Sequence, residues 1–329
     1  MNWKNENVLI TGGAGFIGSH LTEKLVELGA KVKVLVHYNS RNDWGHLEYL
    51  SKAILNHIEI FQGDVQDPYS VQKAVDGCSI VFHLASLIAI PYSYVAPASY
   101  VETNVKGTLN VMEACLKAEV KRVVHTSTSE TYGTALYTPI DERHPLQGQS
   151  PYSASKIGAD KIVESYYRSF DLPVSTLRPF NTFGSRQSAR AVIPTIISQA
   201  LTSNVVELGS LDPVRDLTFV KDTVLGFIKM ADSEKVIGEV INIGNGQGIT
   251  IGDLAKKIIS LVGKNIQIRT NEIRIRPEKS EVMKLICDNS KAEAFMNWEP
   301  TYSMEAGLKE TIDFIKENID QYKPGIYNI

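Results

Sequence analysis

Tyr152 and Lys156 are two residues whose side chains can share one chemical task. They stand four positions apart, and a helix places side chains with this spacing on the same face. A tyrosine becomes a base when a nearby cation lowers its pKa from about 10, and Lys156 supplies a cation one helical turn away. Such pairs also occur on ordinary solvated helix faces, so the meaning of this pair depends on what lies beside it.

A hydroxyl-rich triplet with one carboxylate, Thr128-Ser129-Glu130, follows an apolar run that begins at Val123. β-Branched residues in such a run predict a buried strand. In open α/β sheets, ligands bind beyond the carboxyl ends of the strands, where the triplet would lie. Hydroxyl residues are also common in turns. Combined with the tyrosine and the lysine, the triplet predicts one catalytic group: Thr128, Ser129, Glu130, Tyr152 and Lys156.

A glycine pattern near the amino terminus predicts a dinucleotide site. Gly12, Gly15 and Gly18 recur every third residue between an apolar strand at 8–10 and a helix-compatible run at 19–28. This spacing allows a tight turn, close approach of the backbone to a pyrophosphate, and close packing of the helix on the strand. The flanking strand and helix give the pattern its weight. Phe16 and Ile17, at the start of the helix, are predicted cofactor contacts.

The end of the second strand, at 31–36, bears on the choice between NAD and NADP. An acid there normally binds the ribose of NAD, whereas an NADP site needs a cation. His37, Ser40 and Arg41 follow this strand and the first acid is only Asp43, which favours NADP without excluding NAD. Asp64 is predicted to face the adenine or to cap the next turn. The remaining predicted cofactor contacts are Val65, Leu84, Ala85, Ser86, Thr126, Tyr152, Lys156 and Pro179.

Short strands alternate with helices along most of the chain. Further strands are predicted at 58–61, 79–84, 174–177 and 240–243, and helices at 98–118, 152–170 and 303–317. This alternation predicts an α/β fold with a doubly wound parallel Rossmann sheet and a smaller C-terminal α/β lobe. We expect residues 1–179 plus about 219–245 to form the dinucleotide-binding domain. Residues 180–218 plus 246–329 are expected to form the substrate lobe.

Composition excludes several other classes of protein. A net charge of −3 with interspersed acids and bases predicts no nucleic-acid partner and no anionic membrane. The apolar stretch at 80–90 contains His83 and Ser86, so it is too short and too polar to span a bilayer. Three dispersed cysteines and no apolar signal-peptide core predict a cytoplasmic protein without disulfides. The seven histidines lack the spacing of a metal site.

The sequence resembles the extended short-chain dehydrogenase/reductases that act on nucleotide sugars, over nearly the whole chain. The resemblance rests on the segment Thr11 to Gly18, on Tyr152 with Lys156, and on Arg178-Pro179-Phe180-Asn181. The triplet at 128–130 is similar to that of nucleotide-sugar 4,6-dehydratases. UDP-glucuronate decarboxylases share it, whereas 4-epimerases have small residues at the position of Glu130. Segments 37–40, 44–45, 87–91 and 147–151 are most similar to bacterial GDP-N-acetylglucosamine 4,6-dehydratases of the legionaminic acid pathway.

The resemblance implies an internal redox dehydration with a cofactor that stays bound. Tyr152 takes the proton of the sugar 4-hydroxyl, Thr128 holds that oxygen, and Glu130 removes the C5 proton. Either Glu130 or Ser129 then protonates the departing C6 hydroxyl. UDP-glucuronate decarboxylation, 4-epimerisation and a catalytically silent dinucleotide-binding module remain open. The implied nucleotide-sugar contacts are Thr128, Asn181, Arg190, Val192, Arg215 and Arg276.

The same relatives imply a homodimer or a higher homo-oligomer. Its expected interface is formed by the helices at 98–118 and 152–170. Apolar residues that the first of these helices could contribute are Tyr100, Val101, Val105 and Leu109. The same residues could equally pack on the chain's own sheet.

Overall fold

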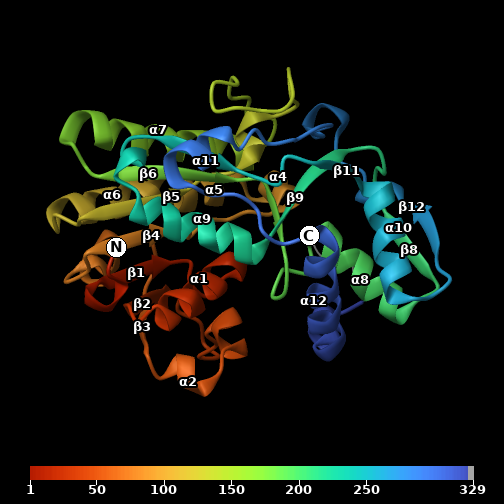
Figure 1. Ribbon diagram of the computed structural model, residues 1–329, viewed down its shortest axis with the longest axis horizontal. Coiled ribbons are helices and arrows are strands. Elements are labelled where there is room, and N and C mark those ends of the chain that lie inside the picture. Colours follow the sequence, from red (N-terminus) through yellow and green to blue (C-terminus); the bar gives the residue numbers. More distant parts are fainter. Residues whose placement is uncertain (325–329) are drawn as a thin grey trace.

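A parallel sheet of seven strands organises the molecule (Figure 1), which is described here by a computed structural model that covers residues 1–324. The strand order is β10-β6-β5-β4-β1-β2-β3, and all neighbouring strands pair in parallel. This confirms the predicted Rossmann-type α/β fold. The strands are β1 (Asn7–Thr11), β2 (Lys31–Val36), β3 (Ile58–Gln62), β4 (Ile80–His83), β5 (Arg122–Thr126), β6 (Val174–Pro179) and β10 (Val240–Ile243).

Helices cover both faces of this sheet because its strands are apolar on both sides. In β1, Val8 and Ile10 pack in one buried cluster and Leu9 packs in another, as the alternation of side chains along a strand requires. Helices α1 (Phe16–Glu27) and α9 (Val220–Asp232) belong to the first cluster. Helices α3 (Pro68–Val75), α6 (Gly107–Lys117) and α7 (Pro151–Phe170) belong to the second.

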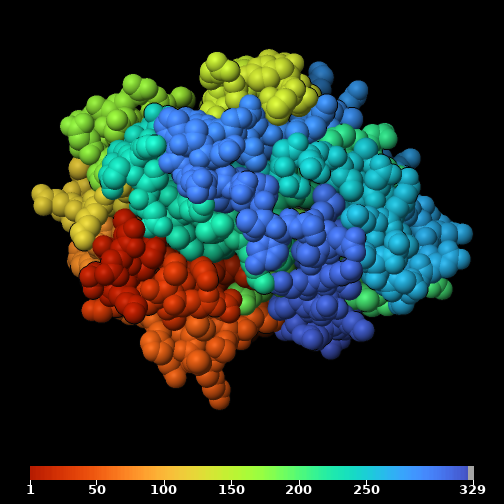
Figure 2. Space-filling view, in the orientation of Figure 1, coloured from red at the N-terminus to blue at the C-terminus, as the bar shows by residue number. Residues whose placement is uncertain are grey.

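Most of the rest of the chain forms a smaller α/β part at the right of Figure 1, coloured from green through cyan to blue there and in the surface view of Figure 2. The chain enters it just after Pro179, where β6 ends and β7 (Asn181–Phe183) begins. One small sheet has the order β11-β9-β7, and β12 pairs with β8. The elements are β8 (Val205–Leu208), β9 (Val214–Phe219), β11 (Gly248–Thr250), β12 (Gln267–Thr270), α8 (Val192–Thr202), α10 (Ile251–Val262) and α12 (Met304–Glu317). Shorter helices elsewhere are α2 (Lys52–Leu55), α4 (Ile90–Val95), α5 (Pro97–Tyr100) and α11 (Ser290–Met296).

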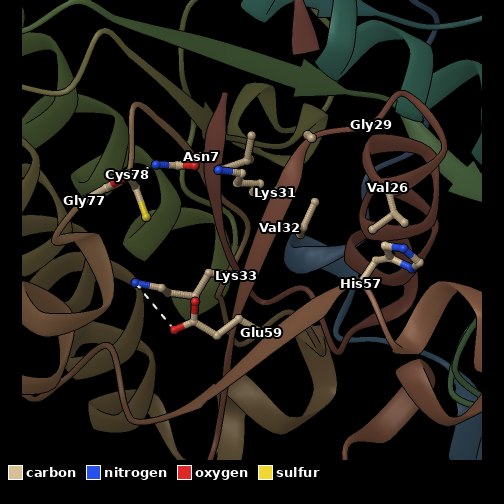
Figure 3. A pocket seen from close by; sticks show the side chains of 12 residues that line it. Asn7, Val26, Gly29, Lys31, Val32, Lys33, His57, Glu59, Gly77 and Cys78 are labelled. Atoms are coloured by element: carbon tan, nitrogen blue, oxygen red, sulfur yellow. Dashed lines mark hydrogen bonds and ion pairs between the residues drawn. The ribbon is translucent and has the colours of Figure 1, made fainter. Parts of the chain in front are cut away.

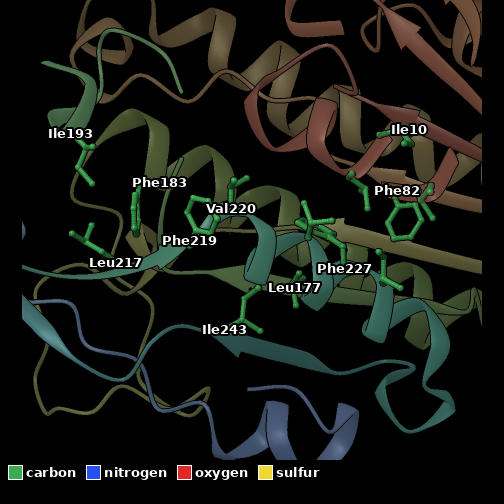
Figure 4. Packing of buried hydrophobic residues seen from close by; sticks show 14 of the residues in the cluster. Ile10, Phe82, Leu177, Phe183, Ile193, Leu217, Phe219, Val220, Phe227 and Ile243 are labelled. Atoms are coloured by element: carbon green, nitrogen blue, oxygen red, sulfur yellow. The ribbon is translucent and has the colours of Figure 1, made fainter. Parts of the chain in front are cut away.

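One apolar cluster joins the two parts of the molecule. Figure 4 shows it running from Ile10 and Phe82 in the large sheet, through Phe227 of α9, to Phe219 and Ile193. The latter two residues belong to β9 and α8 of the smaller part. The large sheet and the smaller part are therefore held together by continuous packing.

The single helix predicted at 98–118 is instead three segments. Between α5 and α6 lies a π-helical turn, η3 (Val101–Lys106), and such turns are frequent at functional sites. Tyr100 is fully buried in its own chain, with its ring 6.2 Å from that of Tyr152. Tyr100 therefore packs within its own chain, which was the alternative to a subunit contact. Val101 and Leu109 are exposed.

No helix among residues 1–324 is long and apolar enough to cross a membrane. Within the same residues, no group of three or more His, Cys, Asp or Glu side chains is arranged to hold a metal ion.

Candidate active site

The glycine turn leaves the amino end of α1 open to a ligand. Gly12 has φ +73°, and a Cβ there would lie 2.6 Å from the backbone nitrogen of Ala85. A Cβ on Gly18 would lie 2.1 Å from the carbonyl oxygen of Gly12, so the helix packs directly on the turn. Gly15 is the exposed N-cap residue and provides no side-chain cap. The first amides of α1, from Phe16 and Ile17, therefore suit a pyrophosphate.

The segment after β4 is fixed by a buried asparagine that the sequence reasoning missed. Asn104 accepts hydrogen bonds from the Ser86 hydroxyl (2.9 Å) and the Leu87 amide (2.8 Å). Its amide group donates to the Leu87 carbonyl (3.0 Å) and to Ser155 Oγ (2.9 Å) on α7. Asn104 lies in the π-helical turn, and a polar residue inside an otherwise packed helix was the signal available for it. It ties the predicted cofactor segment 84–86 to the helix that carries Tyr152.

The cations predicted for the adenosine end are only partly free. His37 Nε2 lies 3.1 Å from Asp64 Oδ2, while Asp64 Oδ1 accepts from the Gln66 amide at 2.8 Å. Asp64 therefore caps the next turn, as one of the two predictions had it, and also places a carboxylate beside the end of β2. Ser40 and Arg41 are exposed. Arg41 is therefore the main positive charge available to bind the 2′-phosphate of NADP.

The catalytic candidates converge at the carboxyl end of β5. Thr128 is the N-cap of the short helix η4 (Ser129–Tyr132) and accepts from the Glu130 amide at 3.3 Å. Tyr152 lies in the first turn of α7, which starts at a capping box formed by Ser150 and Ser153. Thr128 hydrogen-bonds the Tyr152 side chain, and the charge of Glu130 acts on the same phenol. Two separate elements thus bring the hydroxyl, the carboxylate and the phenol together.

Burial is the main influence on the pKa of Tyr152 in this structure. Burial raises it well above its ordinary value, and the negative charge of Glu130 raises it further, while the hydrogen bond with Thr128 lowers it. Lys156 points elsewhere, because its Nζ donates to the Thr126 carbonyl at 2.6 Å. Burial lowers the pKa of Lys156 to about 8, against the opposing effect of the Asp160 carboxylate. Desolvation dominates the pKa of Tyr152 in the protein by itself, so a lowering of that pKa by Lys156 together with the positive nicotinamide stays a prediction.

Two of the predicted arginines meet around a carboxylate that the sequence reasoning missed. Arg215 Nη2 lies 3.1 Å from Glu281 Oε1, and Arg276 Nη1 lies 3.6 Å from the same oxygen. Burial lowers the pKa of Arg215, and the charges of Glu130 and Glu281 oppose that shift. Arg215 is therefore close to Glu130, the predicted catalytic carboxylate. Ser280 Oγ donates to the Gln149 carbonyl at 2.8 Å, which fixes this segment beside the loop before α7.

The other predicted contacts differ in how well they fit. Asn181 Oδ1 and Thr126 Oγ1 are buried without a hydrogen-bond partner, so each is free to bind a ligand. Burial raises the pKa of Tyr100 to about 12, and Arg190 is a charge that opposes this, so Arg190 lies on the Tyr152 side of the molecule. Pro179 ends β6, and Val192 begins α8 half-buried. The open glycine turn and the unpartnered Thr126 hydroxyl fit a dinucleotide.

A separate surface hollow lies at the opposite edge of the large sheet (Figure 3). It measures about 400 Å³, and its lining includes Asn7 and Lys31, which are the first residues of β1 and β2. Lys33 and Glu59 form an ion pair in it at 3.7 Å. Because parallel strands carry their catalytic residues at the carboxyl ends, this hollow is no part of the catalytic site.

Comparison with known proteins identifies the family. A family model described as GDP-mannose 4,6 dehydratase matches residues 9–311. The chain belongs to this family. A UDP-N-acetyl-alpha-D-glucosaminuronate decarboxylase of Bacillus cytotoxicus is 33% identical over 94% of this chain and 97% of its own length. The human dTDP-D-glucose 4,6-dehydratase is 29% identical over 97% of this chain and 92% of its own length.

A solved structure with the same fold was determined with a cofactor in place. It is the dTDP-glucose 4,6-dehydratase of Streptomyces venezuelae with NAD and TYD bound, with a TM-score of 0.85 and 28% identity over 96% of this chain and 99% of that one. UDP-glucose 4-epimerases are also among the similar proteins. The prediction of an NAD(P)-dependent nucleotide-sugar enzyme of the extended short-chain dehydrogenase/reductase superfamily is confirmed. Its relatives include dehydratases, decarboxylases and epimerases.

Proposed function

We propose that this protein is a nucleotide-sugar 4,6-dehydratase, with GDP-N-acetylglucosamine as its substrate. The observation that carries the proposal is the position of Glu130, whose carboxylate lies close enough to act on both Tyr152 and Arg215. A 4-epimerase needs only proton transfer at the C4 hydroxyl, which would leave this carboxylate without a task. A dehydratase needs a second base for the C5 proton, and Glu130 is the only carboxylate of the triplet.

In this mechanism, NAD(P) would be held at the glycine turn and the unpartnered Thr126 hydroxyl, and would supply hydride-transfer chemistry at C4 and C6 of the sugar. Thr128 holds the C4 oxygen, and Tyr152 takes its proton, so that C4 becomes a ketone. The raised pKa of Tyr152 has to be offset before the phenol can act as a base. The proposal assigns that task to the charge of Lys156, one helical turn along α7, together with the positive charge that an oxidised cofactor would bring.

Glu130 then removes the C5 proton, which the neighbouring ketone has made acidic. The C6 hydroxyl leaves as water and takes up one proton. Ser129 is 2% exposed and its hydroxyl does not ionise near neutral pH. We therefore assign both the removal of the C5 proton and the delivery of a proton to the leaving hydroxyl to Glu130. When C6 then receives the hydride, C5 takes up a proton, and return of the proton that Tyr152 took from the 4-hydroxyl balances the cycle.

The nucleotide end of the substrate is assigned to Arg215, Arg276 and Asn181. Arginine can bind two phosphate oxygens at once, and the free Asn181 oxygen suits a hydroxyl or amide donor. The GDP-N-acetylglucosamine assignment rests on the resemblance of segments 87–91 and 147–151. Both segments border the site, because Leu87 contacts Asn104 and Gln149 contacts the arginine-bearing segment through its carbonyl.

The deciding experiment is mass spectrometry of products from separate incubations with GDP-N-acetylglucosamine, GDP-mannose, dTDP-glucose and UDP-glucuronate, without added cofactor. Loss of one water from GDP-N-acetylglucosamine is the expected result, and loss of water from another sugar would correct the substrate only. Loss of carbon dioxide from UDP-glucuronate would overturn the dehydratase assignment in favour of a decarboxylase. Conversion to a product of equal mass would indicate an epimerase.

We propose further that Arg41 gives a preference for NADP over NAD. Its exposed guanidinium lies beyond β2, where a 2′-phosphate would bind. After bound cofactor has been removed from the protein, Arg41→Ala is expected to weaken NADP binding about tenfold and NAD binding about twofold or less. The difference corresponds to the loss of one charged contact. Equal affinities in the unaltered protein would contradict the preference, which the Asp64 carboxylate beside His37 already opposes.

We also propose a cytoplasmic homodimer. Cys78, Cys115 and Cys287 are buried and unpaired, which suits a reducing compartment. Val101 and Leu109 on the segment η3–α6 and Phe170 on α7 are exposed apolar residues, and these are the expected interface helices. Light scattering coupled to gel filtration measures the mass, and replacing Leu109 with Lys is expected to give the monomer.

A further inference from the structure

A buried ion pair lies directly behind the catalytic residues. Asp160 of α7 stands one turn after Lys156, and its carboxylate accepts from Arg178 Nη2 of β6 at 2.7 Å. The same carboxylate accepts from Ser127 Oγ at 2.6 Å and from the His125 ring at 3.2 Å. Asp160 is 6% exposed and Arg178 is 3% exposed. Both charges are therefore removed from water.

Arg178 extends this contact to both sides of the catalytic triplet. Its Nε donates to Ser127 Oγ at 3.3 Å, just before Thr128, and its Nη1 donates to Tyr132 Oη at 2.7 Å, just beyond Glu130. The guanidinium also lies over the Tyr132 ring, 4.7 Å from its centre. Tyr132 in turn donates to Asn242 Oδ1 of β10 at 2.8 Å. Each polar group of Arg178 thus has a partner.

The network joins two elements that must keep a fixed separation. The triplet is held at both flanks by Arg178, and Arg178 is held by Asp160 on the helix that presents Tyr152 and Lys156. A buried ion pair is a poor source of stability, because desolvation offsets the attraction. The Asp160–Arg178 pair can instead fix the position of the triplet relative to α7, because a fully hydrogen-bonded buried network is rigid.

We propose that Asp160 and Arg178 are positioning residues, which hold the Thr128-Glu130 segment against Tyr152 and Lys156 for proton transfer at the sugar C4 hydroxyl. The inference rests on the proposed function only in this first step. Oxidation at C4 is common to dehydration, decarboxylation and 4-epimerisation, so any nucleotide sugar that the protein oxidises can serve in the test.

Asp160 also acts on Lys156 through its charge. Lys156 faces Asp160 on its own helix, Arg178 from β6, and His125 and His83 from β5 and β4. Burial lowers the pKa of both histidines, that of His125 to about 4, so they are neutral. Asp160 raises the pKa of Lys156 and Arg178 lowers it. Removing the carboxylate should therefore make Lys156 lose its proton at a lower pH.

The test is the rate of C4 oxidation in Asp160→Asn across a range of pH. We expect kcat to fall about 100-fold, as for a misplaced reacting group, with KM changed less than about threefold. We also expect the alkaline limb of the pH profile to move to lower pH. Arg122→Met is the matched control, because Arg122 is equally buried and ion-paired, with Glu234 at 2.6 Å, but lies at the amino end of β5. It should retain kcat and the pH profile.

Two further variants keep the test decisive if Asp160→Asn does not fold. Asp160→Asn with Arg178→Met removes both charges together, which avoids an unpaired buried arginine, and Ser127→Ala deletes a single hydroxyl. Each is expected to fold and to lower kcat at nearly constant KM. Folded variants with the kcat of the unaltered protein and an unmoved pH profile would overturn the inference. An unaltered protein that oxidises no nucleotide sugar would instead mean that the proposed function has failed.

Discussion

In the proposed mechanism, Glu130 is the residue that a dehydratase needs and an epimerase does not. Its removal should therefore slow dehydration and leave oxidation at C4. Glu130→Gln keeps the shape of the side chain and removes the base for C5, so dehydration is expected to slow by about 100- to 10,000-fold. Oxidation at C4 should continue, because the charge of Glu130 raises the pKa of Tyr152 and its loss lowers that pKa. Near-ultraviolet absorbance would then report accumulating reduced cofactor. An unchanged rate of water loss would rule out Glu130 as the base.

Lys156 should set the alkaline limit of activity. Burial lowers its pKa to about 8, so the ammonium loses its proton, and with it the charge that favours a phenolate, as the pH rises through that value. We expect kcat to fall above about pH 8, and the limb to disappear in Lys156→Arg, which keeps its charge over this range. A profile that stays level to about pH 10 would mean that the charge of Lys156 is not required.

In the proposed site, Glu281 is expected to compete with the substrate phosphates for Arg215. Its carboxylate lies 3.1 Å from Arg215 Nη2, and a pyrophosphate must displace or share that contact. Glu281→Gln removes the charge, and we expect GDP to bind about tenfold more tightly, equivalent to about 1.4 kcal/mol. Calorimetric titration measures this directly. Glu278→Gln is the control, since Glu278 is exposed on the same segment. Weaker binding in Glu281→Gln would mean that the carboxylate orients Arg215 rather than competing for it.

At the scale of elements, the turn between β1 and α1 depends on two glycines for different reasons. A Cβ on Gly18 would lie 2.1 Å from the Gly12 carbonyl oxygen and 2.7 Å from Gly13 Cα. Gly18→Ala is therefore expected to destabilise the fold by about 1–3 kcal/mol, as for overpacking, and to weaken cofactor binding. Gly15→Ala meets only the Gly12 carbonyl at 3.2 Å, so we expect it to weaken cofactor binding with little loss of stability. Thermal unfolding with and without NAD separates the two effects.

Local pattern was sufficient for most elements but not for contacts between distant residues. Strands β2 and β10 have the predicted bounds, and the glycine turn and the triplet lie at the predicted edge. The π-helical turn was missed because a shift of one residue leaves the apolar pattern of 98–118 nearly unchanged. The carboxylate of Glu281 was missed because its partner Arg215 is 66 positions away. The upward effect of burial on the pKa of Tyr152 could not be predicted because burial depends on the packed structure.

At the scale of the whole molecule, the two proposed domains should unfold together. The apolar cluster of Figure 4 continues from the large sheet into β9 and α8 without a break, so neither part can lose its packing alone. Trp3 and Trp298 are both buried in this cluster. Trp3 stacks near Phe82 of β4, and Trp298 donates to the Asp222 carbonyl of α9, so they report on two places in it. In urea, we expect the fluorescence of a Trp44→Phe variant and its far-ultraviolet circular dichroism to follow one transition.

Variants that keep one of these two tryptophans make the test specific. If the fluorescence of the variant with Trp3 alone and that of the variant with Trp298 alone each follow the circular dichroism of the same variant, the cluster unfolds as one unit. A Trp298 signal that is lost at lower urea than the helical signal would contradict this and would show that the cluster unfolds in parts. Cooperative unfolding has a functional consequence, because Arg215 and Arg276 of the smaller part must stay in register with Glu130 at the edge of the large sheet. Continuous packing between the parts is what can hold the two ends of a nucleotide sugar at a fixed distance.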